Sequence, residues 1–155
     1  MKKIYLIVIL FLVLVNVVFA RTIKLNNFDQ LLKELNNGEI VRVVVHYGNC
    51  KLISGNEEKT SPDAIGGMYI GTYEYFAPMS IGNPKGFLAF SHTNLINYGG
   101  FIYNYVKFKI YDDNTVKITA QYANPGDFSL EMNENFFSEI NNGKNKGAVY
   151  FYKQE

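Results

Sequence analysis

The sequence is poor in the residues that proteins use for cross-links and metal sites. Its 155 residues include one cysteine, two histidines and no tryptophan. The single cysteine, Cys50, cannot form a disulfide within the chain. The spacing of a zinc site is absent from Cys50, His46 and His92. The acidic run 112–114 is not followed by the other ligand positions and the glycine of a calcium-binding loop. We therefore predict no metal and no cofactor.

The only long apolar run lies at the N-terminus. Met1-Lys2-Lys3 precedes a nearly continuous apolar stretch over 4–18, and Val18 and Ala20 stand at positions −3 and −1 of a cleavage point after Ala20. This pattern is typical of a secretory signal peptide, and the stretch is short for a membrane-spanning helix. We predict that residues 1–20 are cleaved and that 21–155 is a single exported domain. It would be extracellular, or periplasmic in a bacterium, without stable membrane insertion.

Cleavage would also change the charge of the chain. Removal of Lys2 and Lys3 leaves 13 basic residues against 14 acidic ones, so the formal net charge goes from +1 to −1. A chain without a basic excess has no general attraction to polyanions, and we predict no nucleic-acid partner. In an oxidising compartment Cys50 would be an orphan thiol. We predict a monomer in preference to a Cys50-linked dimer.

The residue pattern predicts one helix followed by strands. Asn27 caps an amphipathic helix over 28–35, and Gly38 ends it. Strands are predicted at 40–47 (buried on both faces), 68–76, 86–95, 101–111, 115–122, 128–132, 136–140 and 148–152, with a brief one at 51–53. We therefore predict an α+β domain, in which the helix packs on one face or end of a curved, mainly antiparallel sheet of about 7–8 strands. Closure of that sheet into a barrel is left open.

The predicted hairpin 101–122 offers the best candidate ligand surface. Its first strand alternates an apolar face with a face of aromatic and basic residues: Tyr103, Tyr105, Lys107, Lys109 and Tyr111. Aromatic rings beside cations can stack on sugars, peptides or single strands. The alternative is that this face is merely the outside of an amphipathic strand, or is covered by the helix.

No arrangement of residues points clearly to catalysis. His46 and Cys50 would share a strand face if the strand continued through both, but Gly48-Asn49 favours an end between them. We predict no catalytic residues, and a non-enzymatic binding module with an unknown protein or glycan partner. The alternative is a secreted hydrolase, which would use a Cys50/His46 thiol site or a pair of carboxylates acting on glycans.

The order of several short motifs resembles a known family. The helix and Gly38 precede the strand 41–47 and Cys50, and Gly66-Gly67, Phe90-Ser91-His92-Thr93, 103–106, 113–116 and 142–152 follow. Over roughly 28–152 the chain resembles the VirK family of small exported proteins, which are largely uncharacterised. The resemblance implies export and a β-rich single domain, without an established activity.

The resemblance also implies that a disulfide has been lost. Members of this family often carry a second cysteine in the penultimate strand, where this chain has Ser138. Some also carry a histidine at the position of Asn94. Cys50 would then be the remaining half of an intrachain pair.

Overall fold

A computed structural model describes residues 22–154 of the chain, so the predicted signal peptide lies outside the described residues. The elements are β1 (Thr22–Leu25), α2 (Phe28–Asn36), β2 (Val41–His46), the 3₁₀ turn η1 (Tyr47–Asn49), β3 (Lys51–Ser54), β4 (Glu57–Lys59), β5 (Ile65–Tyr69), β6 (Glu74–Phe76), β7 (Phe87–Asn97), β8 (Phe101–Tyr111), β9 (Thr115–Ala123), β10 (Leu130–Glu139) and β11 (Val149–Gln154).

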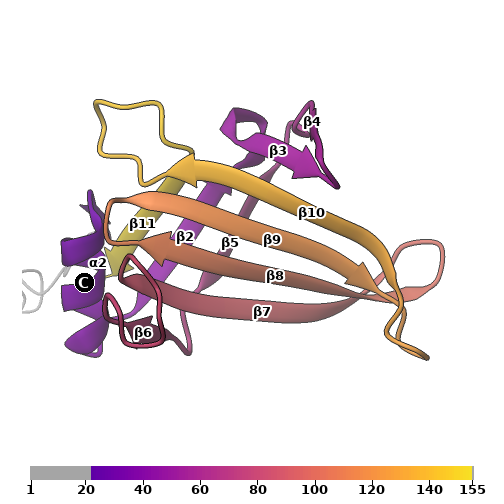
Figure 1. Cartoon of the computed structure of the whole chain (residues 1–155), viewed down its shortest axis with the longest axis horizontal. Helices are drawn as coiled ribbons and strands as arrows, with labels where there is room; N and C mark the ends of the chain where they lie inside the picture. Colours follow the sequence, from indigo (N-terminus) through magenta and orange to yellow (C-terminus); the bar gives the residue numbers. More distant parts are fainter. Residues whose placement is uncertain (1–21, 155) are drawn as a thin grey trace, which may run out of the picture.

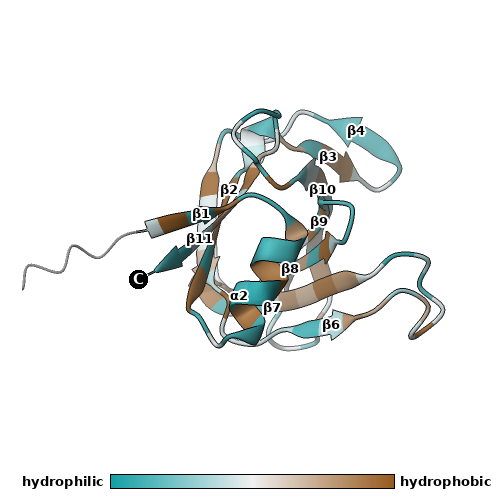
Figure 2. Ribbon diagram, turned by 90° about the vertical axis from the view of Figure 1, so that its left-hand side faces the viewer, coloured by the Kyte–Doolittle hydropathy of each residue, from teal (hydrophilic) through white to brown (hydrophobic). Residues whose placement is uncertain are grey.

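The strands form two separate sheets (Figures 1 and 2). One has the order β1-β11-β2-β5 and the other β4-β3-β10-β9-β8-β7-β6, and the strands pair antiparallel throughout both. The prediction of an α+β domain with one curved sheet is therefore wrong, because the described chain is a mainly β, two-sheet structure without a closed barrel. Antiparallel pairing itself was predicted correctly.

The break between the sheets falls inside a segment that was predicted as one strand. The chain leaves the first sheet at Tyr69, the end of β5, and enters the second sheet at Glu74, the start of β6. Conversely, the two strands predicted at 128–132 and 136–140 are one strand, β10, whose register shifts between Leu130 and Met132. The strands β1 and β4 were not predicted.

The helix begins and ends where the sequence predicts, because both ends carry local caps. The Asn27 side chain accepts a 2.9 Å hydrogen bond from the backbone N–H of Gln30. The Gln30 side chain accepts one from Asn26, one residue earlier than in a standard capping box. At the other end Gly38, with φ of +79°, completes a Schellman motif. Within residues 22–154 no helix is long and apolar enough to cross a membrane.

The helix closes one end of the space between the sheets. Figure 1 shows α2 at one end of the molecule, and Figure 2 shows it between the two layers. Its apolar residues Phe28, Leu31 and Leu35 are buried in the core. The backbone N–H of Phe28 also donates a 2.7 Å hydrogen bond to the Asn114 side chain in the β8–β9 turn. The helix therefore plugs an end of the core and does not lie across the face of a single curved sheet.

The four-stranded sheet has only one buried face. Val41, Val43 and Val45 of β2 are fully buried, whereas Arg42 is exposed on the other side. The prediction that this strand is buried on both faces is wrong, because only one side of its sheet faces the second layer.

The predicted hairpin is confirmed in the seven-stranded sheet. The strands β8 and β9 pair with Phe108 opposite Ile118 and Ile110 opposite Val116, and all four side chains are buried toward the other sheet. The alternation that the sequence shows therefore separates a core face from an outer face in this sheet.

Candidate functional site

The predicted aromatic and basic stripe lies on the outer face of β8, in the interior of the seven-stranded sheet. The structure brings all its members onto one line, partly exposed to solvent: Tyr103, Tyr105, Lys107, Lys109 and Tyr111. On β9 their direct neighbours include Gln121, Thr119 and Lys117. The helix lies on the other side of this sheet (Figure 2) and does not cover the stripe.

The structure does not join Cys50 and His46 into a thiol site. The chain turns through η1 between them, and the buried Cys50 thiol donates to the backbone carbonyl of His46, with 3.7 Å between Sγ and O. The His46 ring packs against Tyr150 instead, with 5.1 Å between ring centroids. Burial raises the pKa of Cys50 to about 11, although the Ser138 hydroxyl lowers it to a smaller extent. A thiol nucleophile needs the opposite shift.

Cys50 does face the residue that the resemblance singled out. In the β3–β10 ladder Lys51 lies opposite Phe137, so the next step along both strands brings Cys50 opposite Ser138. The Ser138 side chain interacts with the thiol and also accepts a 2.9 Å hydrogen bond from the backbone N–H of Ala148. Directly opposed residues of an antiparallel pair lie within the Cα separation that a disulfide spans.

The raised pKa of Cys50 predicts a loss of stability at alkaline pH. The neutral thiol is favoured in the folded chain, so its contribution is fully present below the unfolded pKa of 9.0 and is lost as the pH rises toward about 11. Burial also raises the pKa of Tyr47 from 10.0 to about 12, which adds a loss above pH 10. We expect urea unfolding to show falling stability from pH 9 upward. The fall between pH 9 and 10 should be clearly smaller in Cys50→Ala, where only Tyr47 contributes; an equal fall in both chains would contradict the assignment.

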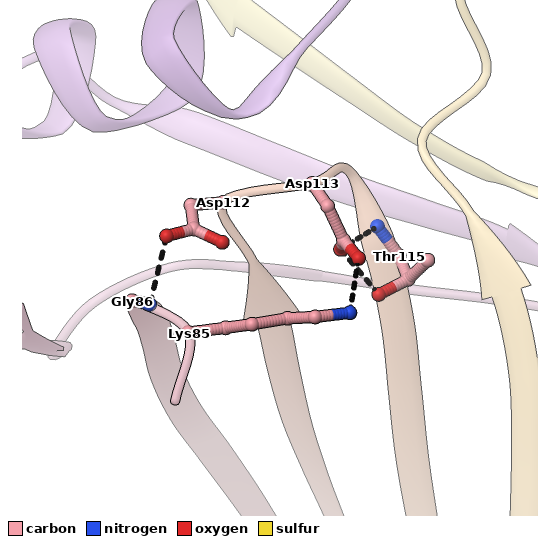
Figure 3. A network of polar contacts seen from close by, with 5 residues as sticks. All are labelled: Lys85, Gly86, Asp112, Asp113 and Thr115. Atoms are coloured by element: carbon pink, nitrogen blue, oxygen red, sulfur yellow. Dashed lines mark hydrogen bonds and ion pairs between the residues drawn. The ribbon is translucent and has the colours of Figure 1, made fainter. Parts of the chain in front are cut away.

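The acidic side chains of the turn after β8 form a salt bridge and hydrogen bonds within the fold (Figure 3). Asp113 forms a salt bridge with Lys85 and accepts hydrogen bonds from the backbone and hydroxyl of Thr115. These contacts hold the pKa of Asp113 at about 2. Asp112 accepts a 2.8 Å hydrogen bond from the backbone N–H of Gly86. Among residues 22–154, no group of three His, Cys, Asp or Glu side chains is placed to hold a metal ion.

A cleft of about 520 Å³ opens between the two sheets, and sequence reasoning did not identify it. It is lined by Tyr47 of η1, by residues of β5, and by the core-facing side of β7 and β8: Tyr47, Gly66, Gly67, Met68, Tyr69, His92, Asn94, Asn104 and Val106. The strands β7 and β8 extend beyond the shorter sheet (Figure 1), so their far halves are not covered by it. The cleft therefore begins where the apolar core ends.

One wall of the cleft carries polar side chains at positions where the core would require apolar ones. On β7 the buried Leu88 and Phe90 are followed on the same face by the exposed His92 and Asn94. Asn94 lies directly opposite Asn104 of β8. The Asn94 side-chain oxygen accepts a 2.8 Å hydrogen bond from Nε2 of His92. Because that oxygen can only accept, Nε2 carries the hydrogen and the amide nitrogen of Asn94 remains available to donate.

The other wall depends on glycine. A Cβ atom at Gly66 would lie 2.9 Å from Cε2 of Tyr47, which is closer than real contacts allow. The missing side chain thus lets the Tyr47 ring lie against β5, where it also makes an edge contact with Phe136 at 4.9 Å between centroids. This close approach occurs within the edge strand β5 of the four-stranded sheet.

The cleft has no fixed charge. Its lining contains no Asp, Glu, Lys or Arg side chain, and burial raises the pKa of Tyr47 to about 12, so this phenol stays neutral at physiological pH. The polar side chains that it offers are two amides, one imidazole and the phenol of Tyr47. Such a lining can donate and accept hydrogen bonds without attracting ions of either sign.

Comparison with known proteins places the chain in a family. The family model described as "VirK protein" matches residues 24–128. The fold is similar to the crystal structure of a VirK family protein from Legionella pneumophila, with a TM-score of 0.59 and 15% sequence identity, over 83% of this chain and 98% of that one. A search of curated proteins finds no significant match. The chain belongs to the VirK family, as its motifs had suggested.

Proposed function

We propose that this VirK family chain is an exported, non-enzymatic binding module whose cleft holds a small, neutral, polyhydroxylated ligand such as a sugar. The observation that carries this proposal is the uncharged, amide-bearing cleft of about 520 Å³ at the end of the apolar core. Its volume is in the range of small-molecule sites. Export rests on the pattern of residues 1–20.

The chemistry of the lining favours a sugar over an ion or a purely apolar ligand. Asn94 and Asn104 stand opposite each other on neighbouring strands, and each amide both donates and accepts. A pair of this kind suits adjacent hydroxyl groups, which also do both. Tyr47 lines the same cleft and provides ring surface for the apolar face of a sugar, whereas the Tyr69 ring lies against Arg42 on the outer face of its sheet.

The position of Cys50 supports a monomeric module. The thiol is buried, with 8% of the residue exposed, and lies against Ser138 of the same chain. A buried thiol cannot reach a second copy without local unfolding, which disfavours a Cys50-linked dimer.

If the cleft is the ligand site, substitution of Asn104 should weaken ligand binding. We expect Asn104→Leu to weaken the binding of a neutral sugar by at least about 5-fold, because loss of a hydrogen-bonding partner costs about 1–3 kcal/mol. Isothermal titration calorimetry with a panel of neutral mono- to tetrasaccharides measures this effect.

The matched control is Asn133→Leu. Asn133 is an exposed residue on β10 of the same sheet, where its side chain accepts a 3.1 Å hydrogen bond from Gln121 on the outer face. Binding should change less than 2-fold in this variant. Equal weakening in both variants, or binding that neither affects, would contradict the cleft as the ligand site.

A further inference from the structure

A second hollow, of about 250 Å³, lies on the outer face of the seven-stranded sheet, on the opposite side from the cleft. It is lined by Lys107, Lys109 and Tyr111 of β8 and by Lys117 and Thr119 of β9. In the β8–β9 ladder Lys109 stands directly opposite Lys117, and Lys107 opposite Thr119. Three ammonium groups therefore project from neighbouring positions on one face.

The positive charge of this hollow is not neutralised within the described chain. The salt bridges of residues 22–154 engage Lys51, Lys85 and Lys153, and none engages the three lysines of the hollow. Like charges directly opposite each other destabilise an antiparallel pair. The chain as a whole has a formal net charge of only +1, so the concentration is local. An arrangement that costs folding energy in this way indicates a site for an anion.

Two of the lysines are held in place by aromatic rings. The Lys109 ammonium lies 4.4 Å from the ring centroid of Phe87 on β7, and the Lys117 ammonium lies 5.7 Å from that of Phe137 on β10. These contacts restrain the long side chains from both sides of the hollow. Restraint before binding lowers the entropy that an incoming ligand must remove.

We propose that this hollow binds a sulfate or phosphate ester group of a linear acidic glycan. Along β8 the residues that face outward are Tyr105, Lys107, Lys109 and Tyr111, so ring surface flanks the charged pair at both ends. The lysines hold the anionic group and the rings stack on the sugar units that precede and follow it. A chain lying along the strand uses the whole row.

The acidic groups around the hollow favour a narrow chain over a membrane surface. Asp112 and Asp113 follow Tyr111 at one end of the row, Glu58 pairs with Lys51 on the same face, and Glu74 lines the adjoining hollow with Lys107. A flat anionic bilayer would meet these carboxylates together with the lysines. A single glycan chain can follow β8 and avoid them.

The test compares two double variants that remove the same charge. The probe is a size-defined heparin tetrasaccharide, with inorganic sulfate and phosphatidylglycerol vesicles as separate arms at constant ionic strength. Lys109→Gln/Lys117→Gln should weaken tetrasaccharide binding at least 10-fold. The control Lys144→Gln/Lys146→Gln, in the exposed loop between β10 and β11, should change it less than 2-fold.

The remaining outcomes also decide the proposal. The hollow variant removes a repulsive pair together with two cation–π contacts, so its melting temperature should change little, which shows that it folds. The tetrasaccharide should bind at least 10 times more tightly than inorganic sulfate. Equal weakening in both double variants, equal affinity for sulfate alone, or binding only to vesicles would each overturn the proposal. None of these results bears on the neutral cleft.

Discussion

We expect Phe151→Ala to lower the free energy of unfolding by about 3–5 kcal/mol. Phe151 lies on β11, between β1 and β2 in the four-stranded sheet, and none of its surface is exposed. It is shielded because this sheet faces a second layer, so the truncation leaves a cavity in the shared core. A small domain typically has only about 5–15 kcal/mol of stability, so the variant should be marginally folded. The chain has no tryptophan, so urea unfolding is followed by circular dichroism.

The matched control is Phe101→Ala. Phe101 begins β8 in the other sheet and is 70% exposed. The same truncation there should cost less than about 1 kcal/mol, because it creates no cavity. If the two variants lost similar stability, the description of Phe151 as buried between two sheets would be wrong.

We expect Ser138→Cys to form a disulfide with Cys50 and to stabilise the fold by about 2–4 kcal/mol. The bridge would close a loop of about 90 residues, which is worth about 4–5 kcal/mol in the chain-entropy account. Part of that gain is lost, because in the unsubstituted chain the Ser138 hydroxyl accepts a hydrogen bond from the backbone N–H of Ala148, and the substitution removes this hydrogen bond. The oxidised variant should contain no free thiol, and its urea midpoint should fall when a reductant is added.

Glu139→Cys is the control. It tests whether disulfide formation depends on the position of the second cysteine and not merely on its presence. Glu139 is the next residue on β10, but its side chain lies on the exposed, opposite face of the strand. This variant should keep two free thiols and respond little to reductant. Two free thiols in Ser138→Cys as well would refute the proposed alignment of Cys50 with Ser138.

The elements with local signals could be predicted from the sequence. The helix follows from its Asn27 cap, its apolar spacing and Gly38, all of which lie within a dozen residues. The hairpin of β8 and β9 follows from period-two alternation on both sides of a short polar turn. Each of these patterns is determined by neighbouring residues.

The division into two sheets could not be predicted in the same way. The strand β5 pairs with β2, whereas β6, which follows after a gap of four residues, pairs with β7. Nothing within 68–76 specifies which partner each half will find, because strand pairing depends on distant segments. The same reason explains why β1, which pairs with β11 at the far end of the chain, was missed.

The cleft did leave a signal in the sequence, although a weak one. Asn104 occupies an inward position of β8 between the buried Ile102 and the partly buried Val106. His92 and Asn94 continue the inward face of β7 after Leu88 and Phe90. A polar residue at an inward position indicates either a satisfied core group or the edge of the core, and the alternation alone does not distinguish them.

The most direct test of the cleft as a ligand site is a ¹H–¹⁵N NMR titration with neutral mono- to tetrasaccharides. The side-chain amide signals of Asn94 and Asn104 report on the cleft, and those of Asn133 and Asn135 report on the outer face of the same sheet. We predict that a bound saccharide shifts the first pair, together with the backbone signals of Gly66 and Gly67, and leaves the second pair unchanged. Shifts confined to Asn133 and Asn135, or no shift with any neutral saccharide, would contradict the account.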